Sequence, residues 1–158
     1  MWKHMVRGGM EMAAYELDDL DRRIIECLRE DGKTPYTTVA NLLGVAEATV
    51  RKRVTRMLQE GVLRITAAVR PERIGLNTQA IVGVKIEGKD LKPIVETLHQ
   101  MENIRYIGVC TGDYDLMLHV AMPSSQELFK FLTETLRDIP GVVESQTSLI
   151  MKVCKEAW

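Results

Sequence analysis

Four basic side chains lie within two helical turns of the N-terminal half of the sequence: Arg51, Lys52, Arg53 and Arg56. Guanidinium and ammonium groups at this spacing could bind phosphate oxygens, and an arginine could also hydrogen-bond the edge of a guanine. The surrounding stretch, residues 45–61, contains only two acidic residues, Glu47 and Glu60. These side chains would suit a nucleic acid, although a solvated helix face is the commoner origin of such a cluster.

Positive charge is concentrated in one part of a chain that is nearly neutral overall. The formal net charge of the 158 residues is -1, yet residues 33–73 hold eight basic and three acidic side chains, a net charge of +5. Residues 16–31 hold three basic and seven acidic side chains, and the chain from residue 76 onward holds eight basic and eleven acidic ones. A localised basic lobe favours nucleic-acid binding over a merely solvated helix.

Three helices are expected to position these side chains. An apolar stripe at helical spacing begins at Leu17 and stops at Gly32. A second, shorter helix follows Thr37 and ends at Gly44, and the basic stretch forms a third helix that ends at Gly61. The basic side chains would therefore stand on the last helix of three.

The close crossing of the second and third helices predicts a helix-turn-helix. Ala40 is small enough for the third helix to pack against it, Gly44 can adopt a left-handed conformation, and Val50 fills the angle between the helices. In this arrangement the third helix enters the major groove of DNA.

Nine residues are candidate DNA contacts: Thr37, Glu47, Ala48, Thr49, Arg51, Lys52, Arg53, Arg56 and Arg64. Arg51 and Lys52 lie in the first turns of the third helix, where a recognition helix reaches base edges. Arg53 and Arg56 are better placed for phosphates. In the stretch VLRITAAV, which follows Gly61, apolar and polar residues alternate enough to predict a strand. Arg64 could contact a phosphate from this strand, as a small wing does.

The spacing of apolar residues changes in the second half of the chain. The polar stretch RPERIGLN, residues 70–77, is expected to link a winged-helix-like helix-turn-helix domain over residues 15–69 to a second domain over residues 78–158, with residues 1–14 as an N-terminal extension. Alternating stretches and helical stripes in the second domain follow the order βαββαβ, and the last strand is expected in VVESQTSLIMKV. This order is the ferredoxin-like topology, so the predicted fold class is α+β.

A four-stranded sheet with two helices on one face leaves its other face open. That face is expected to include apolar side chains, so pairing of two copies through their sheets is the simplest way to cover it. Two recognition helices related by a two-fold axis would match a palindromic site.

The turn TGDYD, residues 111–115, lies between two expected strands, with Gln146 on the neighbouring last strand. Its two carboxylates could bind an ammonium group, and backbone N–H groups near Gly112 could bind a carboxylate. A free amino acid would suit both, whereas an ordinary turn explains the same residues without a ligand. Both interpretations stay open on these residues alone.

Other chemistry has little support in the sequence. The three cysteines are isolated in apolar settings, which predicts buried thiols rather than disulfides or a metal site, and the three histidines are scattered. Neither a metal nor a cofactor is expected. The apolar runs are far shorter than a membrane span, and the first 14 residues lack the apolar core of a secretory signal, so a cytoplasmic protein is expected.

Two stretches resemble the Lrp/AsnC (feast/famine) family of transcriptional regulators. The first, from Leu17 to Leu63, begins LDDLDRRIIECL and is similar to the N-terminal signature of that family. The second, TGDYDLMLHV, is similar to the conserved turn of its ligand-binding (RAM) domain. The resemblance covers residues 17–154, and the two motifs occur in the family's order.

This resemblance implies a transcriptional regulator, and not an enzyme, that binds double-stranded DNA and is controlled by an amino acid. It also implies homodimers that assemble into tetramers or octamers. Carried over by position, the ligand-binding residues are Thr111, Gly112, Asp113, Tyr114, Asp115 and Gln146. The sequence departs from the family at Ala46, where a serine usually caps the reading helix. Loss of an N-cap costs about 1 kcal/mol, so the start of this helix is expected to fray until DNA contacts it.

Two other functions remain as alternatives. The first is an architectural protein that compacts DNA with little sequence preference. The second is an enzyme, because sirohaem decarboxylases resemble the same two-domain fold. Such an enzyme would need basic and histidine groups for the carboxylates of a tetrapyrrole, and His119 and Arg105 are the only nearby candidates. It would leave the basic third helix unexplained.

Overall fold

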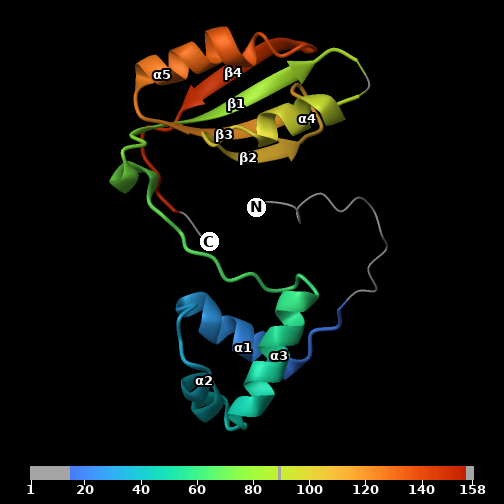
Figure 1. Cartoon of the computed structure of the whole chain (residues 1–158), viewed down its shortest axis with the longest axis vertical. Helices are drawn as coiled ribbons and strands as arrows, with labels where there is room; N and C mark the ends of the chain where they lie inside the picture. The colour runs from blue at the N-terminus through green and yellow to red at the C-terminus, as the bar shows by residue number, and fades with distance from the viewer. Residues whose placement is uncertain (1–14, 89, 156–158) are drawn as a thin grey trace. The chain divides into compact units, whose positions relative to one another are not determined.

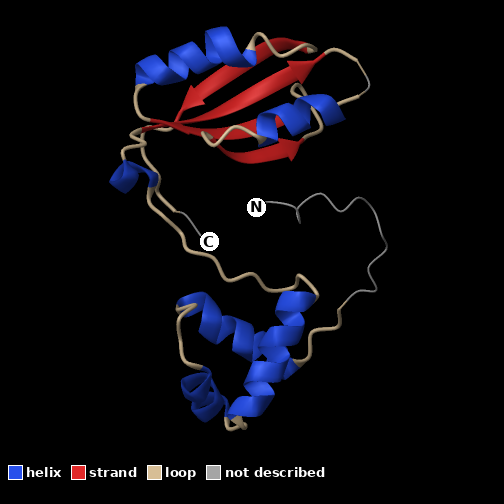
Figure 2. Cartoon of the chain, viewed as in Figure 1, coloured by secondary structure: helices blue, strands red, loops and turns tan. Residues whose placement is uncertain are grey.

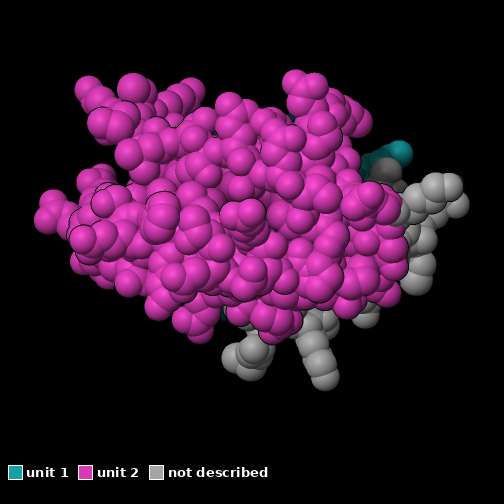
Figure 3. All heavy atoms as spheres, turned by 90° about the horizontal axis from the view of Figure 1, so that it is seen from above, with its two compact units in different colours: residues 1–67 teal, residues 68–158 magenta. Residues whose placement is uncertain are grey.

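The computed structural model describes residues 15–88 and 90–155 (Figure 1). The chain divides into a helical unit that ends at Ala67 and a mixed unit that begins at Ala68 (Figures 2 and 3). Each unit has its own hydrophobic core.

Three helices form the first unit: α1 (Asp19–Glu30), α2 (Tyr36–Leu43) and α3 (Glu47–Gln59). Asp18 caps α1, because its side chain accepts from the N–H of Asp21 at 2.8 Å and the side chain of Asp21 accepts from the N–H of Asp18 at 3.4 Å. This reciprocal pair satisfies two backbone donors at the helix start. In contrast, Ala46 at the start of α3 makes no side-chain cap bond.

The structure confirms the predicted crossing of α2 and α3. Gly44 ends α2 with a φ of 70°, in the left-handed region. Ala40 is 3% exposed and Val50 is completely buried, as a close crossing requires. All three helices contribute to one core: Ile24, Leu28, Val39, Ala40, Val50, Val54 and Met57. The opposite side of α3 is therefore left to solvent.

The strand expected in VLRITAAV does not form. Residues 62–69 are irregular, and the N–H groups of Val62 and Leu63 both donate to the carbonyl oxygen of Met57, at 2.9 and 3.1 Å. The described part of the helical unit holds no strand with which this segment could pair, so Ile65 stays exposed. Arg64 lies on this irregular segment rather than on a wing strand.

The second unit has the predicted βαββαβ order: β1 (Thr78–Ile86), α4 (Lys92–His99), β2 (Ile104–Val109), β3 (Leu116–Met122), α5 (Ser125–Lys130) and β4 (Val142–Leu149). The strands are antiparallel in the order β2-β3-β1-β4. A π-helical segment (Phe131–Leu136) continues α5, and a short 3-10 helix (Pro71–Ile74) occupies part of the expected linker. Residues of α4 and α5 share one core with β1 and β3, so both helices cover the same face of the sheet (Figure 2).

The last strand is shorter than predicted. β4 ends at Leu149, which pairs with Ala80, and the N–H of Ile150 then donates to the carbonyl oxygen of Gln79 at 2.8 Å. β1 begins at Thr78, so the chain beyond Ile150 has no partner strand. This explains why the predicted continuation to Val153 does not form.

In the described part of the second unit, the face of the sheet away from the helices is open. Ile81 lies on it, because its neighbours Ala80 and Val82 point into the core and side chains alternate along a strand. Met117 of β3 lies on the same face as the partner of Gly83. Ile81 and Met117 are half-buried, so apolar side chains occur on the open face, as predicted.

Candidate nucleic-acid interface and ligand turn

The outer side of α3 forms one continuous surface, which we call the α3 surface. Its residues are Glu47, Ala48, Arg51, Lys52, Thr55, Arg56 and Gln59. All except Thr55 and Gln59 are predicted DNA contacts. Arg51, Lys52 and Arg56 are exposed, so the surface presents three cations and the single carboxylate of Glu47. Such cations can bind phosphates or the edge of a guanine.

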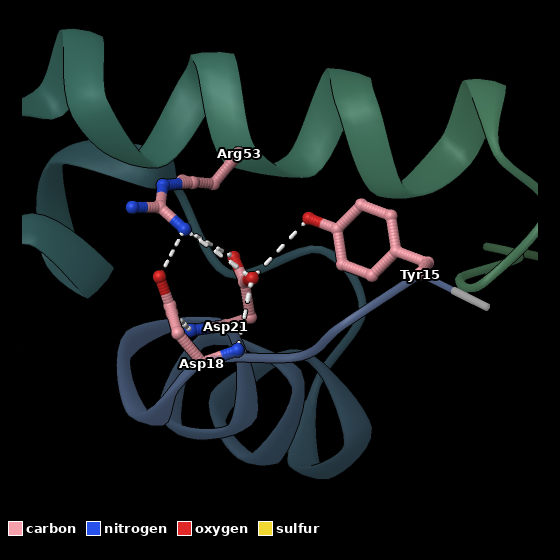
Figure 4. Close-up of polar contacts among 4 residues, drawn as sticks. All are labelled: Tyr15, Asp18, Asp21 and Arg53. Atoms are coloured by element: carbon pink, nitrogen blue, oxygen red, sulfur yellow. Dashed lines mark hydrogen bonds and ion pairs between the residues drawn. The ribbon is translucent and has the colours of Figure 1, made fainter. Parts of the chain in front are cut away.

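Four predicted DNA contacts are not part of the α3 surface. Thr37 is exposed on α2, Thr49 is half-buried on α3, and Arg64 lies beyond the end of α3. The fourth, Arg53, belongs to α3 but points to the start of α1 (Figure 4).

Arg53 forms ion pairs within the helical unit. Its Nη1 atom binds the carboxylate of Asp18 and lies 3.2 Å from Oδ1 of Asp21. Asp21 is only 1% exposed, and its Oδ2 also accepts from the hydroxyl of Tyr15 at 3.2 Å. Arg53 is therefore held inside the helical unit, where carboxylates of α1 compensate its charge, and its predicted phosphate contact stays a prediction.

The same contacts shift two pKa values. The backbone N–H of Asp21, and then Arg53, hold the pKa of Asp18 below its ordinary value. The Asp18 carboxylate in turn raises the pKa of Arg53. Both shifts favour the charged pair, so Arg53 ties α3 to α1. The three-residue spacing of Asp18 and Asp21 is explained by their capping of α1, so it gave no separate signal for the pairing with Arg53.

Two tyrosines contact the arginines of the α3 surface, and the sequence analysis missed both. The Cζ atom of Arg51 lies 5.5 Å from the centroid of the Tyr36 ring, and that of Arg56 lies 4.8 Å from the centroid of the Tyr15 ring. Arg51 also binds Glu47 at 2.5 Å, one helical turn away. Both guanidinium groups are therefore held from one side.

The predicted ligand turn joins β2 to β3. Gly112 has a φ of 117°, a conformation that favours glycine. Asp115 closes the turn through its backbone, because its carbonyl oxygen accepts from the N–H of Cys110 at 2.8 Å. Its side chain is also engaged, since Oδ2 accepts from the N–H of Ile86 at 2.7 Å, where the pairing of β1 with β4 shifts register. Asp115 thus supports β1 rather than offering a free carboxylate.

Tyr114 reaches from the turn across the open face of the sheet. Its ring covers Gly83, where an added Cβ would lie 2.7 Å from the ring. Its hydroxyl donates to Oε1 of Gln146 on β4. Among the predicted ligand residues, Thr111, Gly112 and Asp113 are exposed, so they form the accessible part of the turn.

No group of three or more histidine, cysteine, aspartate or glutamate residues within 15–88 and 90–155 could hold a metal ion. Cys110 and Cys154 are exposed, contrary to the expected burial, because each follows the end of its strand. No helix in this part of the chain is long and apolar enough to cross a membrane.

Both units match known protein families. Residues 17–58 match the family model of the AsnC-type helix-turn-helix domain, and residues 79–157 match that of the Lrp/AsnC ligand binding domain. An HTH-type transcriptional regulator of Pyrococcus furiosus is 36% identical over 140 residues, which cover 88% of this chain and 95% of the relative. The regulator FL11 of Pyrococcus abyssi is 35% identical over 141 residues, covering 89% and 93%.

Solved structures share the fold over nearly the whole chain. The AsnC protein of E. coli superposes with a TM-score of 0.82 at 24% identity, over 90% of this chain and 97% of that one. A transcriptional regulator of Neisseria meningitidis, solved as a complex with L-Met, superposes with a TM-score of 0.83 at 23% identity, over 90% and 94%. The curated relatives and the Neisseria meningitidis neighbour are regulators of transcription, not enzymes.

Proposed function

Because the chain belongs to the Lrp/AsnC family of transcriptional regulators, with a helix-turn-helix DNA-binding domain and a ligand-binding domain, we propose that it recognises a specific operator under the control of a free amino acid. The observation that carries the proposal is the α3 surface. Three exposed basic side chains stand there on the second helix of a helix-turn-helix pair. The protein is a regulator rather than an enzyme, so the sirohaem-decarboxylase alternative is set aside.

The proposed interface places α3 in the major groove of double-stranded DNA. Arg51 and Lys52 reach base edges, with Glu47 and Ala48 beside them in the first turn. Arg56 binds a phosphate. Three predicted contacts beyond the α3 surface complete the interface at its margins: Thr37, Thr49 and Arg64.

The proposed assembly is a homodimer that forms through the open sheet faces and associates further into tetramers or octamers. Half-buried Ile81 and Met117 support this choice of face, because a second copy would remove them from water. A two-fold axis between two copies of α3 predicts a palindromic operator.

The proposed effector is a free amino acid bound at the turn after β2. The exposed carboxylate of Asp113 binds its ammonium group, and backbone N–H groups near Gly112 and Thr111 bind its carboxylate. Tyr114, Gln146 and Asp115 hold the turn against the sheet. The L-Met complex of the Neisseria meningitidis regulator supports an amino acid as the class of ligand.

DNA recognition is tested by selecting duplexes from a randomised pool with the full-length protein. We expect one palindromic sequence to be enriched and bound more tightly than random DNA. In that duplex Arg51→Ala should cost about 1–3 kcal/mol and relax preference at one base pair. Equal affinity for selected and random DNA over a range of salt concentrations would instead favour an architectural protein.

The effector is sought by thermal unfolding in the presence of each amino acid, since a ligand of the native state raises the midpoint by mass action. The amino acid that does so is then added to a titration of the selected duplex. A change in DNA affinity supports the proposal, and an unchanged affinity with every amino acid contradicts it.

A further inference from the structure

We propose that Tyr15 and Tyr36 are positioning residues for DNA binding, each of which holds one arginine of the α3 surface in a fixed orientation. Tyr15 holds Arg56, and Tyr36 holds Arg51. This inference rests on the proposed binding of DNA through α3. Neither tyrosine belongs to α3 itself, since Tyr15 precedes α1 and Tyr36 is the first residue of α2.

The contact of Tyr15 with Arg56 has a rigid support. The distance of 4.8 Å from Cζ to the ring centroid lies within the range of a cation–π interaction. The tyrosine hydroxyl donates to Asp21, which is buried and also paired with Arg53 (Figure 4). A tyrosine hydroxyl is protonated and able to donate at neutral pH, and burial and the Asp21 carboxylate raise the pKa of Tyr15 further. The ring is thus fixed to α1.

The contact of Tyr36 with Arg51 is supported differently. The distance of 5.5 Å is near the limit for a cation–π interaction, but a carboxylate assists it. Glu47 binds Nη2 of Arg51 at 2.5 Å from one helical turn earlier. Arg51 keeps 63% of its side chain exposed, so an exposed ion pair alone would hold it weakly. Ring and carboxylate together restrict the guanidinium to one direction.

Holding an arginine in place aids binding for a physical reason. A free arginine side chain loses much rotamer freedom when it is ordered on DNA, and this loss opposes association. A guanidinium that is already stacked on a ring loses less. Its N–H donors lie in the guanidinium plane, so they stay available for a guanine edge or a phosphate.

Two double-mutant cycles test the inference with the full-length protein and the duplex that the parent selects from a randomised pool. One cycle combines Tyr15→Leu with Arg56→Gln, and the other combines Tyr36→Leu with Arg51→Gln. In the parent each tyrosine change should weaken DNA binding about threefold to tenfold. After the matching arginine is replaced, the same tyrosine change should have almost no further effect.

Three measurements separate positioning from a purely structural role. The crossed pair Tyr15→Leu with Arg51→Gln should be additive, because these residues do not touch. Tyr36→Phe should bind as the parent does, because the ring remains. Tyr15→Phe should weaken binding less than Tyr15→Leu does, because it keeps the ring but loses the hydroxyl bond to Asp21. Tyr15→Leu should also leave the slope of affinity against salt unchanged, whereas Arg56→Gln should lower it by about one, since only the second removes a phosphate contact.

The outcomes distinguish a failure of this inference from a failure of the proposed function. If the arginine changes weaken binding but both matched cycles are additive, the tyrosines do not position the arginines and the inference is wrong. If neither arginine change alters the affinity of the parent, α3 is not the DNA-reading helix and the proposed function itself fails. Thermal unfolding of every variant checks that lost binding does not arise from lost folding.

Discussion

The Asp21 carboxylate is the one buried charge among the described residues, and its surroundings determine what several neighbours do. Burying a carboxylate is costly unless it is paired and hydrogen-bonded. Asp21 accepts from Arg53, from the Tyr15 hydroxyl and from the backbone N–H of Asp18. Arg53 is therefore needed inside the helical unit, and the basic residues available to DNA are fewer than the sequence suggests.

Replacing Arg53 should lower stability more than it lowers affinity for DNA. Arg53→Ala leaves the buried Asp21 without its cation and should reduce the free energy of unfolding by about 1–3 kcal/mol. Urea unfolding followed by circular dichroism measures this change. Lys52→Ala is the matched control on the exposed side of the same helix and should leave the midpoint nearly unchanged. Equal stability of the two variants would contradict the role given to Arg53.

The pKa of Asp18 makes the stability of the helical unit depend on pH. Folding lowers this pKa from its ordinary value of 3.8, so the charged carboxylate stabilises the native state above pH 3.8. That stabilisation is lost as the pH falls through the lower, native pKa. Asp18→Asn keeps an N-cap acceptor but removes the titration. We expect its unfolding free energy to fall less steeply than that of the parent below pH 3.8, and parallel curves would refute this assignment.

At the scale of elements, the sequence predicted correctly those features that depend on residues close together in the chain. Gly44 and Val50 indicated the helix crossing, and the change from helical spacing to alternation indicated the second unit. The failures share one cause. Ile65 lies in an alternating stretch without a partner strand, and β4 stops beside the residue where the antiparallel β1 begins. The ion pairs of Arg53 were not predicted because its partners lie about thirty residues away, next to and on another helix, and helical spacing alone says nothing of them.

Packing of one side chain against the sheet gives a test at the same scale. Gly83→Ala would place a Cβ 2.7 Å from the Tyr114 ring and push the ring off β1. We expect a loss of about 1–3 kcal/mol in unfolding free energy, as for other overpacked sites. In a Tyr114→Ala background the same change should cost much less, because the obstructing ring is gone. An equal cost in both backgrounds would show that Tyr114 does not pack there.

At the scale of the whole molecule, the open sheet face and the uneven charge distribution bear on how copies of the chain associate. The helical unit carries the basic lobe, while the chain from residue 76 onward is net acidic. Copies that associate through their acidic units would leave the basic surfaces available to DNA. The proposed sheet-to-sheet contact therefore agrees with the charge distribution as well as with the half-buried apolar side chains of the open face.

Light scattering should detect this association. The parent is expected to be larger than the 17.9 kDa of one chain. Met117→Glu places a charge on the open face and should shift the population towards the monomer, because burying an unpaired carboxylate is unfavourable. Glu102→Ala, an exposed change in the same unit, serves as the control. A monomeric parent at micromolar concentration would rule out the proposed assembly.

The change in DNA affinity on effector binding should depend on the exposed part of the turn, and not only on the residues that hold the turn against the sheet. Asp113→Ala removes the only carboxylate of the turn that makes no hydrogen bond or ion pair within the described residues, whereas Asp115 is bonded to Ile86. We expect Asp113→Ala to bind the selected duplex as the parent does without effector, because α3 belongs to the other unit. The amino acid should then no longer change DNA affinity, a loss of coupling of about 1–3 kcal/mol. Titration of the duplex with and without the amino acid measures this difference, and Glu102→Ala should respond like the parent. A full response from Asp113→Ala would mean that the turn is only a turn and that the effector binds elsewhere.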